Sequence, residues 1–91
     1  FMFRTEAVIK NEAGIHCRPS AIIISERAKY EGEVTVYSES GDTKLTSALE
    51  LIMLGLQKGS KIQIEVNGPN EDSFAIRLVE FFEKEFDFSI D

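Results

Sequence analysis

The chain has 91 residues, of which 43% are hydrophobic and 29% are charged, and this composition predicts one folded domain over residues 1–91. A domain of this length is too small for two independent cores and leaves little room for a deep substrate cavity, so we expect a functional site on the surface. Sixteen acidic and ten basic residues give a net charge of −6, which opposes non-specific binding to nucleic acid or anionic lipid. No segment approaches the ~20 apolar residues of a membrane-spanning helix, so we expect no membrane insertion.

The cysteine content and the first residues bear on the compartment. Cys17 is the single cysteine and cannot form a disulfide within the chain. Residues 1–4 lack the apolar stretch and the small-residue cleavage site of a secretory signal. We therefore expect a cytoplasmic protein, and a monomer.

Alternating and β-branched segments predict four strands. They are residues 3–9, residues 34–37, a short return strand through Lys44 and Leu45, and residues 61–67. The last of these alternates polar and apolar residues without a break, which is typical of a sheet with one solvent-facing side.

Helical spacing predicts three helices: Cys17 to about Tyr30, a short one that follows Ser47, and one from Glu71 to about Phe86. Their expected apolar faces are Ala21, Ile24 and Ala28; Leu49, Ile52, Met53 and Leu56; and Phe74, Leu78, Phe81 and Phe82. The order βαββαβα predicts an α+β fold, an open-faced β-sandwich with a four-stranded, mainly antiparallel sheet and three helices on one face. Near the end of the chain, we expect Glu80, Glu83, Glu85 and Asp87 to form a solvated helix face and Phe88 to belong to a docked tail.

The most reactive side chains lie together in segment 14–21, Gly-Ile-His-Cys-Arg-Pro-Ser-Ala. His16, the only histidine, stands between a glycine-ended loop and a helix start, where amide N–H groups and the helix dipole favour an anion. Arg18 adds a forked donor that suits phosphate oxygens, and a partly neutral imidazole can accept a phosphoryl group on nitrogen. The residues thus suggest a phosphohistidine site, although a histidine that merely caps a helix explains them too and is the commoner case.

Segment 14–21 resembles the active-site signature of the HPr family, the histidine phosphocarriers of the bacterial phosphotransferase system. That signature runs Gly, aliphatic, His, small, Arg, Pro, small, small, and only Cys17 departs from it, at a position usually held by Ala, Ser or Thr. Because that position chiefly contributes its backbone N–H, we expect a thiol to preserve phosphate binding. The resemblance covers nearly the whole chain, including the order of the elements.

The resemblance implies a stoichiometric carrier, not an enzyme, that needs neither a cofactor nor a metal. Enzyme I, phosphorylated by phosphoenolpyruvate, would pass the phosphoryl group to His16, and His16 would pass it to an EIIA-type acceptor. Cys17 and Arg18 would bind the phosphate. The first two helices would supply the partner interface, which carries over to Ser20, Ala21, Ala48, Leu49 and Ile52. Many members place lysines where this chain has Ser25 and Ala28, with Arg27 and Lys29 on neighbouring faces.

Two further stretches bear on regulation and on the branch of the system. Segment 45–55 resembles the region around the family's regulatory serine, which places Ser47 where HPr kinase phosphorylates many members. Ser47 also stands where a helix N-cap would, and we expect that role whether or not it is phosphorylated. The turn at Gly68 and Pro69 and the tail at residues 86–88 resemble the nitrogen-related branch, whose carrier serves regulation and not sugar uptake.

Other functions fit the sequence less well. A catalytic pair of Cys17 and His16 lacks a third residue to orient the imidazole, and one His beside one Cys does not provide a metal site. The basic residues are scattered, unlike those of a nucleic-acid-binding surface. A small module that binds an anion or a protein at the same helix end without covalent transfer stays open as the alternative function.

Overall fold

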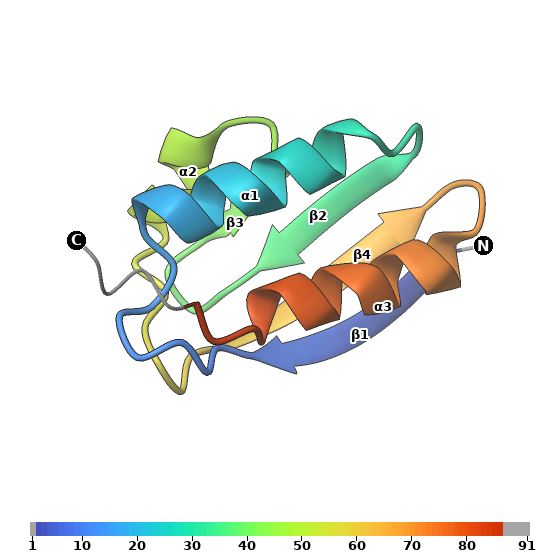
Figure 1. The fold of residues 1–91 in the computed structure, drawn as a ribbon. Coiled ribbons are helices and arrows are strands. Elements are labelled where there is room, and N and C mark those ends of the chain that lie inside the picture. The colour runs from blue at the N-terminus through green and yellow to red at the C-terminus, as the bar shows by residue number, and fades with distance from the viewer. Residues whose placement is uncertain (1, 87–91) are drawn as a thin grey trace.

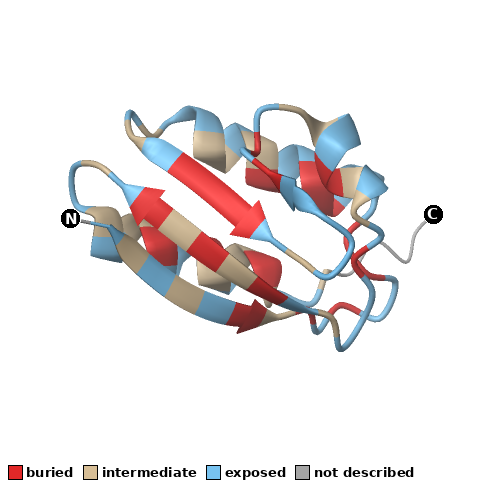
Figure 2. Ribbon diagram, turned by 180° about the vertical axis from the view of Figure 1, so that it is seen from behind, coloured by how far each residue is buried: buried red, intermediate tan, exposed pale blue. Residues whose placement is uncertain are grey.

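The computed structural model describes residues 2–86. In chain order the elements are β1 (Phe3–Val8), α1 (Cys17–Ala28), β2 (Glu33–Tyr37), β3 (Asp42–Thr43), α2 (Ala48–Met53), β4 (Lys61–Asn67) and α3 (Glu71–Phe82). The three helices lie on one face of the sheet (Figure 1), and the opposite face carries none (Figure 2). The predicted βαββαβα open-faced sandwich is confirmed.

The four strands pair in the order β1-β4-β2-β3, and every pair is antiparallel. β4 lies between β1 and β2 and pairs with both. Ile64 is opposite Thr5 of β1 on one side and opposite Val36 of β2 on the other. Its isoleucine and valine side chains are buried under the helices, while Gln63 and Glu65 face the open side.

The core lies between the sheet and the helices. The strands contribute Ala7, Val34, Val36, Ile62, Ile64 and Val66, and the helices contribute Ile23, Leu51, Ala75, Leu78 and Phe82. α3 packs on β1 and β4, and α1 contacts both α2 and α3. None of the helices within residues 2–86 has the length and hydropathy needed to cross a membrane.

The helices differ from the sequence prediction in the faces that they bury. On α1 the buried residues are Pro19, Ser20 and Ile23, whereas Ala21 and Ala28 are exposed. On α2 only Leu51 is buried; Leu49 and Met53 are 64% and 73% exposed, and Leu56 is buried beyond the helix. Because large apolar residues are adjacent in both helices, their spacing is compatible with several buried faces. Packing against the sheet buries a different face from the predicted one.

The end of the chain also differs. α1 ends at Ala28, and α3 ends at Phe82, not near Phe86. Glu83 is half-buried and its carboxylate accepts a hydrogen bond from the Val8 N–H (2.9 Å), so it does not belong to a solvated helix face. The predictions for Asp87 and Phe88 lie outside the described residues.

Candidate functional site: the His16 loop and helix α1

His16 occupies the N-cap of α1, where it joins the loop after β1 to the helix. Its carbonyl accepts the first intrahelical hydrogen bond, from the Ser20 N–H (2.9 Å), while its side chain is exposed and makes no capping hydrogen bond. The prediction that His16 stands at a helix start is therefore confirmed. The imidazole does not serve as a cap, and its direction depends on the backbone that carries it.

Gly14 shapes the loop just before the histidine. Its φ of +75° lies in the left-handed region, and a Cβ at this position would overlap the carbonyl oxygen of Leu56. That same oxygen accepts the Ile15 N–H (3.0 Å), and the Ile15 side chain is buried. Only glycine at position 14 allows the loop and the segment after α2 to approach closely enough for this hydrogen bond, which connects the two segments.

Asn11 closes the other side of the loop. It is only 4% exposed, its carbonyl accepts the Gly14 N–H (2.9 Å), and its side-chain Nδ2 donates to the Gly14 carbonyl (2.8 Å). The asparagine followed three residues later by glycine was the available signal for a side chain that bonds its own turn.

The two residues after His16 are both exposed. Cys17 is a free thiol in the first turn of α1, and Arg18 follows it. Pro19 suits this turn because its missing N–H would have had no intrahelical acceptor. Ser20, predicted as a partner contact, is wholly buried, so its side chain is not available on the surface.

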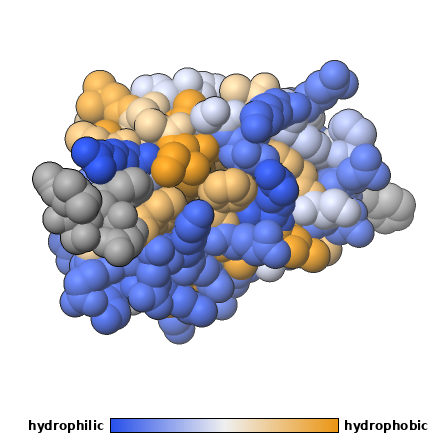
Figure 3. All heavy atoms as spheres, in the orientation of Figure 1, coloured by the Kyte–Doolittle hydropathy of each residue, from blue (hydrophilic) through white to orange (hydrophobic). Residues whose placement is uncertain are grey.

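α2 lies beside α1 and presents a largely apolar surface (Figures 1 and 3). Ser47 caps it, with its Oγ accepting the Leu49 N–H (3.2 Å), as predicted. Ala48 and Ile52 are half-buried and Leu49 is exposed, so these residues and the exposed Ala21 of α1 are accessible to a partner. Met53, which the sequence placed in the core, belongs to the same exposed surface.

The comparisons with known proteins identify this arrangement. The family described as "PTS HPr component phosphorylation site" matches residues 3–84. The chain belongs to the PTS HPr family. It is 32% identical over 84 residues to the phosphocarrier protein HPr of Mycoplasma genitalium, which covers 91% of this chain and 96% of that protein. It is also 32% identical over 80 residues to the phosphocarrier protein NPr of Klebsiella oxytoca, covering 87% and 89% of the two chains.

The solved structures agree on the fold. The crystal structure of HPr from Bacillus anthracis matches with a TM-score of 0.83 at 17% identity, over 90% of this chain and 98% of the other. The family match and the HPr and NPr relatives, not this likeness of fold, show that the protein is a phosphocarrier of the phosphotransferase system, of the HPr or NPr type.

The basic residues of this HPr-family chain are partly engaged elsewhere. Arg27 donates to the backbone carbonyls of Lys44 (3.4 Å) and Tyr30 (3.1 Å), and Lys29 lies 3.5 Å from a Glu26 oxygen. Ser25 and Ala28, at positions where many members carry lysine, are exposed and uncharged. Arg18 and Arg27 are the two basic residues of α1, and Arg18 is the one in the first turn, beside the histidine.

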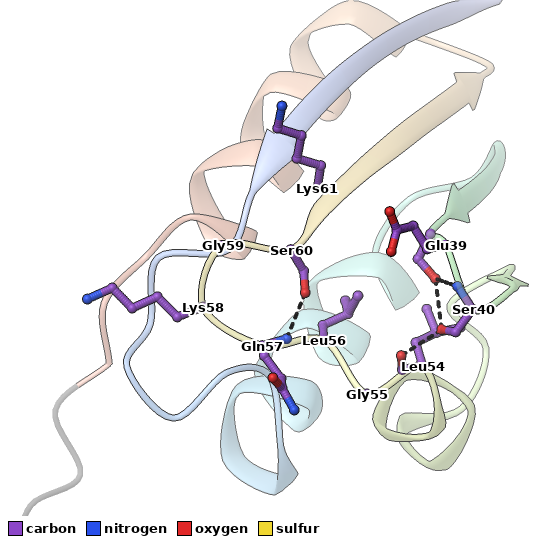
Figure 4. Close-up of a pocket in the computed structure, with 11 residues that line it drawn as sticks. Glu39, Ser40, Leu54, Gly55, Leu56, Gln57, Lys58, Gly59, Ser60 and Lys61 are labelled. Atoms are coloured by element: carbon purple, nitrogen blue, oxygen red, sulfur yellow. Dashed lines mark hydrogen bonds between the residues drawn. The ribbon is translucent and has the colours of Figure 1, made fainter.

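A surface pocket of about 660 Å³ lies next to the loop, between the β2–β3 turn and the segment from Leu54 to Lys61 (Figure 4). Ser60 Oγ accepts the Gln57 N–H (3.0 Å) and shapes this segment. His16 does not line the pocket. Within residues 2–86, no cluster of three or more His, Cys, Asp and Glu side chains could hold a metal ion.

Proposed function

We propose that His16 accepts a phosphoryl group from Enzyme I and passes it to an EIIA-type acceptor in the cytoplasm. The observation that carries the proposal is the placement of the only histidine: it is exposed, it stands at the N-cap of α1, and it lies within residues 3–84, which match the HPr family. An exposed acceptor suits a carrier because two partners must reach the same nitrogen in turn.

The chemistry follows from the imidazole and the helix start. The lone pair of a neutral ring nitrogen forms a bond to phosphorus, while the bond from phosphorus to the donor breaks and its electron pair leaves with the donor. The Arg18 guanidinium and the first-turn amides of Cys17 and Arg18 stabilise the negative charge on the phosphoryl oxygens. The carrier's contribution is thus positioning and electrostatics, as in phosphoryl transfer generally.

The partner surface consists of accessible residues around His16: Ala21 on α1 and Ala48, Leu49 and Ile52 on α2. Leu49 is the best anchor because it is a large apolar side chain that is 64% exposed. Burial of this side chain against Enzyme I or an EIIA-type protein would contribute binding energy close to the transferred group.

Regulation by HPr kinase at Ser47 is a second part of the proposal. Ser47 is half-buried at the start of α2, and its Oγ accepts the N–H of the exposed Leu49. A phosphate there would interact favourably with the helix dipole, so it would not need to unfold α2; it would act by adding negative charge to the partner surface.

A nitrogen-branch carrier, with a regulatory role instead of sugar transport, is the second candidate. The equal identity of the chain to an HPr and to an NPr protein supports keeping both. The acceptor distinguishes them: phosphorylated protein would discharge onto the EIIA-type protein of one branch faster than onto that of the other.

The test is incubation of the protein with phosphoenolpyruvate and Enzyme I from its own source, followed by intact-mass analysis. We expect the gain of one acid-labile phosphoryl group, its loss in His16→Ala, and its retention in Ser25→Ala, an exposed position on the same helix. Unmodified wild-type protein would instead support the non-covalent binding module. Incubation with ATP and HPr kinase, with Ser47→Ala as the control, tests regulation; incorporation that does not depend on Ser47 would contradict it.

A further inference from the structure

We propose that Asn11 is the positioning residue of the phosphorylation site and that it links the His16 loop to the segment that follows α3. The inference rests on the proposed function of His16. It goes further because the hydrogen bonds of Asn11 go to the backbone of Gly14 and Phe86, so Asn11 would act on the imidazole through the backbone.

Asn11 bonds to both backbone polar groups of Gly14. The Gly14 N–H donates to the Asn11 carbonyl (2.9 Å), and the Gly14 carbonyl accepts from Asn11 Nδ2 (2.8 Å). The left-handed backbone of Gly14 is thereby fixed from both sides, and the next N–H, that of Ile15, is bonded to Leu56 (3.0 Å).

The His16 imidazole is not held by a capping hydrogen bond. The side chain is also exposed, so its reach toward a phosphoryl donor is set by the backbone on either side. On one side this backbone is the first turn of α1; on the other it is the chain held by Asn11. Because in-line transfer requires near-attack geometry, a shift of this loop lowers the rate of transfer even when a partner still docks.

The Asn11 side chain makes a second hydrogen bond, to the segment after α3. Asn11 Oδ1 accepts the N–H of Phe86 (2.8 Å), 75 residues further along the chain, while Nδ2 of the same carboxamide donates to Gly14, so the side chain connects two distant segments. Nearby, the Glu83 carboxylate accepts the Val8 N–H (2.9 Å) and lies 3.5 Å from Lys10 Nζ. The segment after α3 is thus bonded to the chain that leads from β1 into the loop, and of Val8, Lys10 and Asn11 it is Asn11 that lies nearest to His16 along the sequence.

Burial makes this network unusually sensitive to substitution. Asn11 is 4% exposed, so water cannot replace a lost partner easily, and an unsatisfied buried donor or acceptor is costly. Asn11→Asp keeps the shape and the acceptor for Phe86, but it replaces the donor with a carboxylate oxygen that faces the Gly14 carbonyl.

The activity test compares Asn11→Asp with Asn67→Asp, which makes the same change of charge at an exposed residue at the far end of β4. We expect Asn11→Asp to lower the maximal rate of phosphorylation by Enzyme I on the order of tenfold, with little change in the carrier concentration that gives half that rate. Asn67→Asp should leave both unchanged. A folded Asn11→Asp protein with the wild-type maximal rate, or with a change only in the half-saturating concentration, would overturn the positioning role.

A stability control separates positioning from loss of fold. Val66→Ala removes a wholly buried side chain near the far end of β4 and should lower the denaturation midpoint while leaving the maximal rate unchanged. If Val66→Ala lowers the rate as much as Asn11→Asp does, the effect is one of stability and the proposal fails.

The link to the segment after α3 has its own test, which does not require activity. Phe86→Pro removes the amide hydrogen that Asn11 Oδ1 accepts and leaves the bond to Gly14 intact. We expect the backbone amide chemical shifts of Ile15 and His16 to move in this variant and in Asn11→Asp, but not in Asn67→Asp. Unmoved shifts would overturn the link, even if wild-type protein proved not to be phosphorylated and the proposed function itself failed.

Discussion

The backbone of Gly14 supports the sharpest prediction of stability. Gly14→Ala places a methyl group against the Leu56 carbonyl oxygen, on a residue whose φ is +75°. The left-handed conformation costs an alanine about 1–2 kcal/mol. Displacement of Leu56 also weakens the Ile15–Leu56 hydrogen bond, worth about 0.5–1.5 kcal/mol. Alanine offsets about 0.4–1 kcal/mol of this by restricting the unfolded chain. We therefore expect a net loss of about 2 kcal/mol in the free energy of unfolding.

Gly55→Ala is the matched control. Gly55 also has a left-handed backbone, with φ of +64°, but a Cβ there would have no atom within 4 Å. Only the conformational cost remains, so we expect a loss of about 1 kcal/mol or less. Urea unfolding followed by circular dichroism measures both variants, with the free energy taken from the midpoint and slope. If Gly14→Ala costs no more than Gly55→Ala, the close approach of the loop to Leu56 is not what requires glycine at this position.

Three further predictions concern the partner surface, the α2 cap and one ion pair. Leu49→Asp should raise the half-saturating concentration for Enzyme I roughly tenfold, whereas Ile76→Asp, at another exposed apolar residue but on α3, should not; equal effects in kinetic titrations would argue against an interface on α2. Ser47→Ala should lower the free energy of unfolding by about 1 kcal/mol, measured in urea, because the bond to the Leu49 N–H is lost; an unchanged value would refute the cap. The hydrogen bond from Arg77 is the main cause that lowers the pKa of Glu26, so this pair stabilises the fold above the ordinary pKa of a glutamate and ceases to do so as the pH falls through the lowered value. The free energy of unfolding of Glu26→Gln should therefore fall less than that of wild type between about pH 6 and about pH 3. If the two free energies change in parallel with pH, the Glu26–Arg77 pair does not have this stabilising role.

Three of the four strands could be predicted from the sequence because alternation has a period of two and allows one phase. The short return strand was predicted through Lys44 and Leu45 and lies instead at Asp42–Thr43, because two residues are too few to show alternation and their position is set by pairing with β2. In β4 the alternation leaves no choice of which side chains face the helices, and the structure buries Ile62, Ile64 and Val66 as expected. The helices were harder: in α1 three isoleucines occur in a row, so apolar spacing fits several faces, and contact with the sheet decides among them.

The site was predictable as a set of residue types but not as a three-dimensional arrangement. The order of Gly14, His16, Arg18 and Pro19 identified both the family and the helix start. The Ile15 N–H donates to the backbone oxygen of Leu56, far along the chain, and no side-chain type in the sequence indicates such a backbone contact. The same limit hid the partner of Asn11 at Phe86, because hydrogen bonds between distant segments arise only once the sheet and α3 have assembled.

Transfer through His16 is the central claim, and a pulse and chase of labelled phosphoryl group tests it most directly. Protein loaded from labelled phosphoenolpyruvate and Enzyme I, then freed of both, is mixed with EIIA-type acceptors from the same source. The account predicts that label leaves His16 and appears in an acceptor in equal amount, and that His16→Ala neither loads nor transfers. Label that stays on the protein in the presence of every such acceptor, or that loads equally well on His16→Ala, would contradict it.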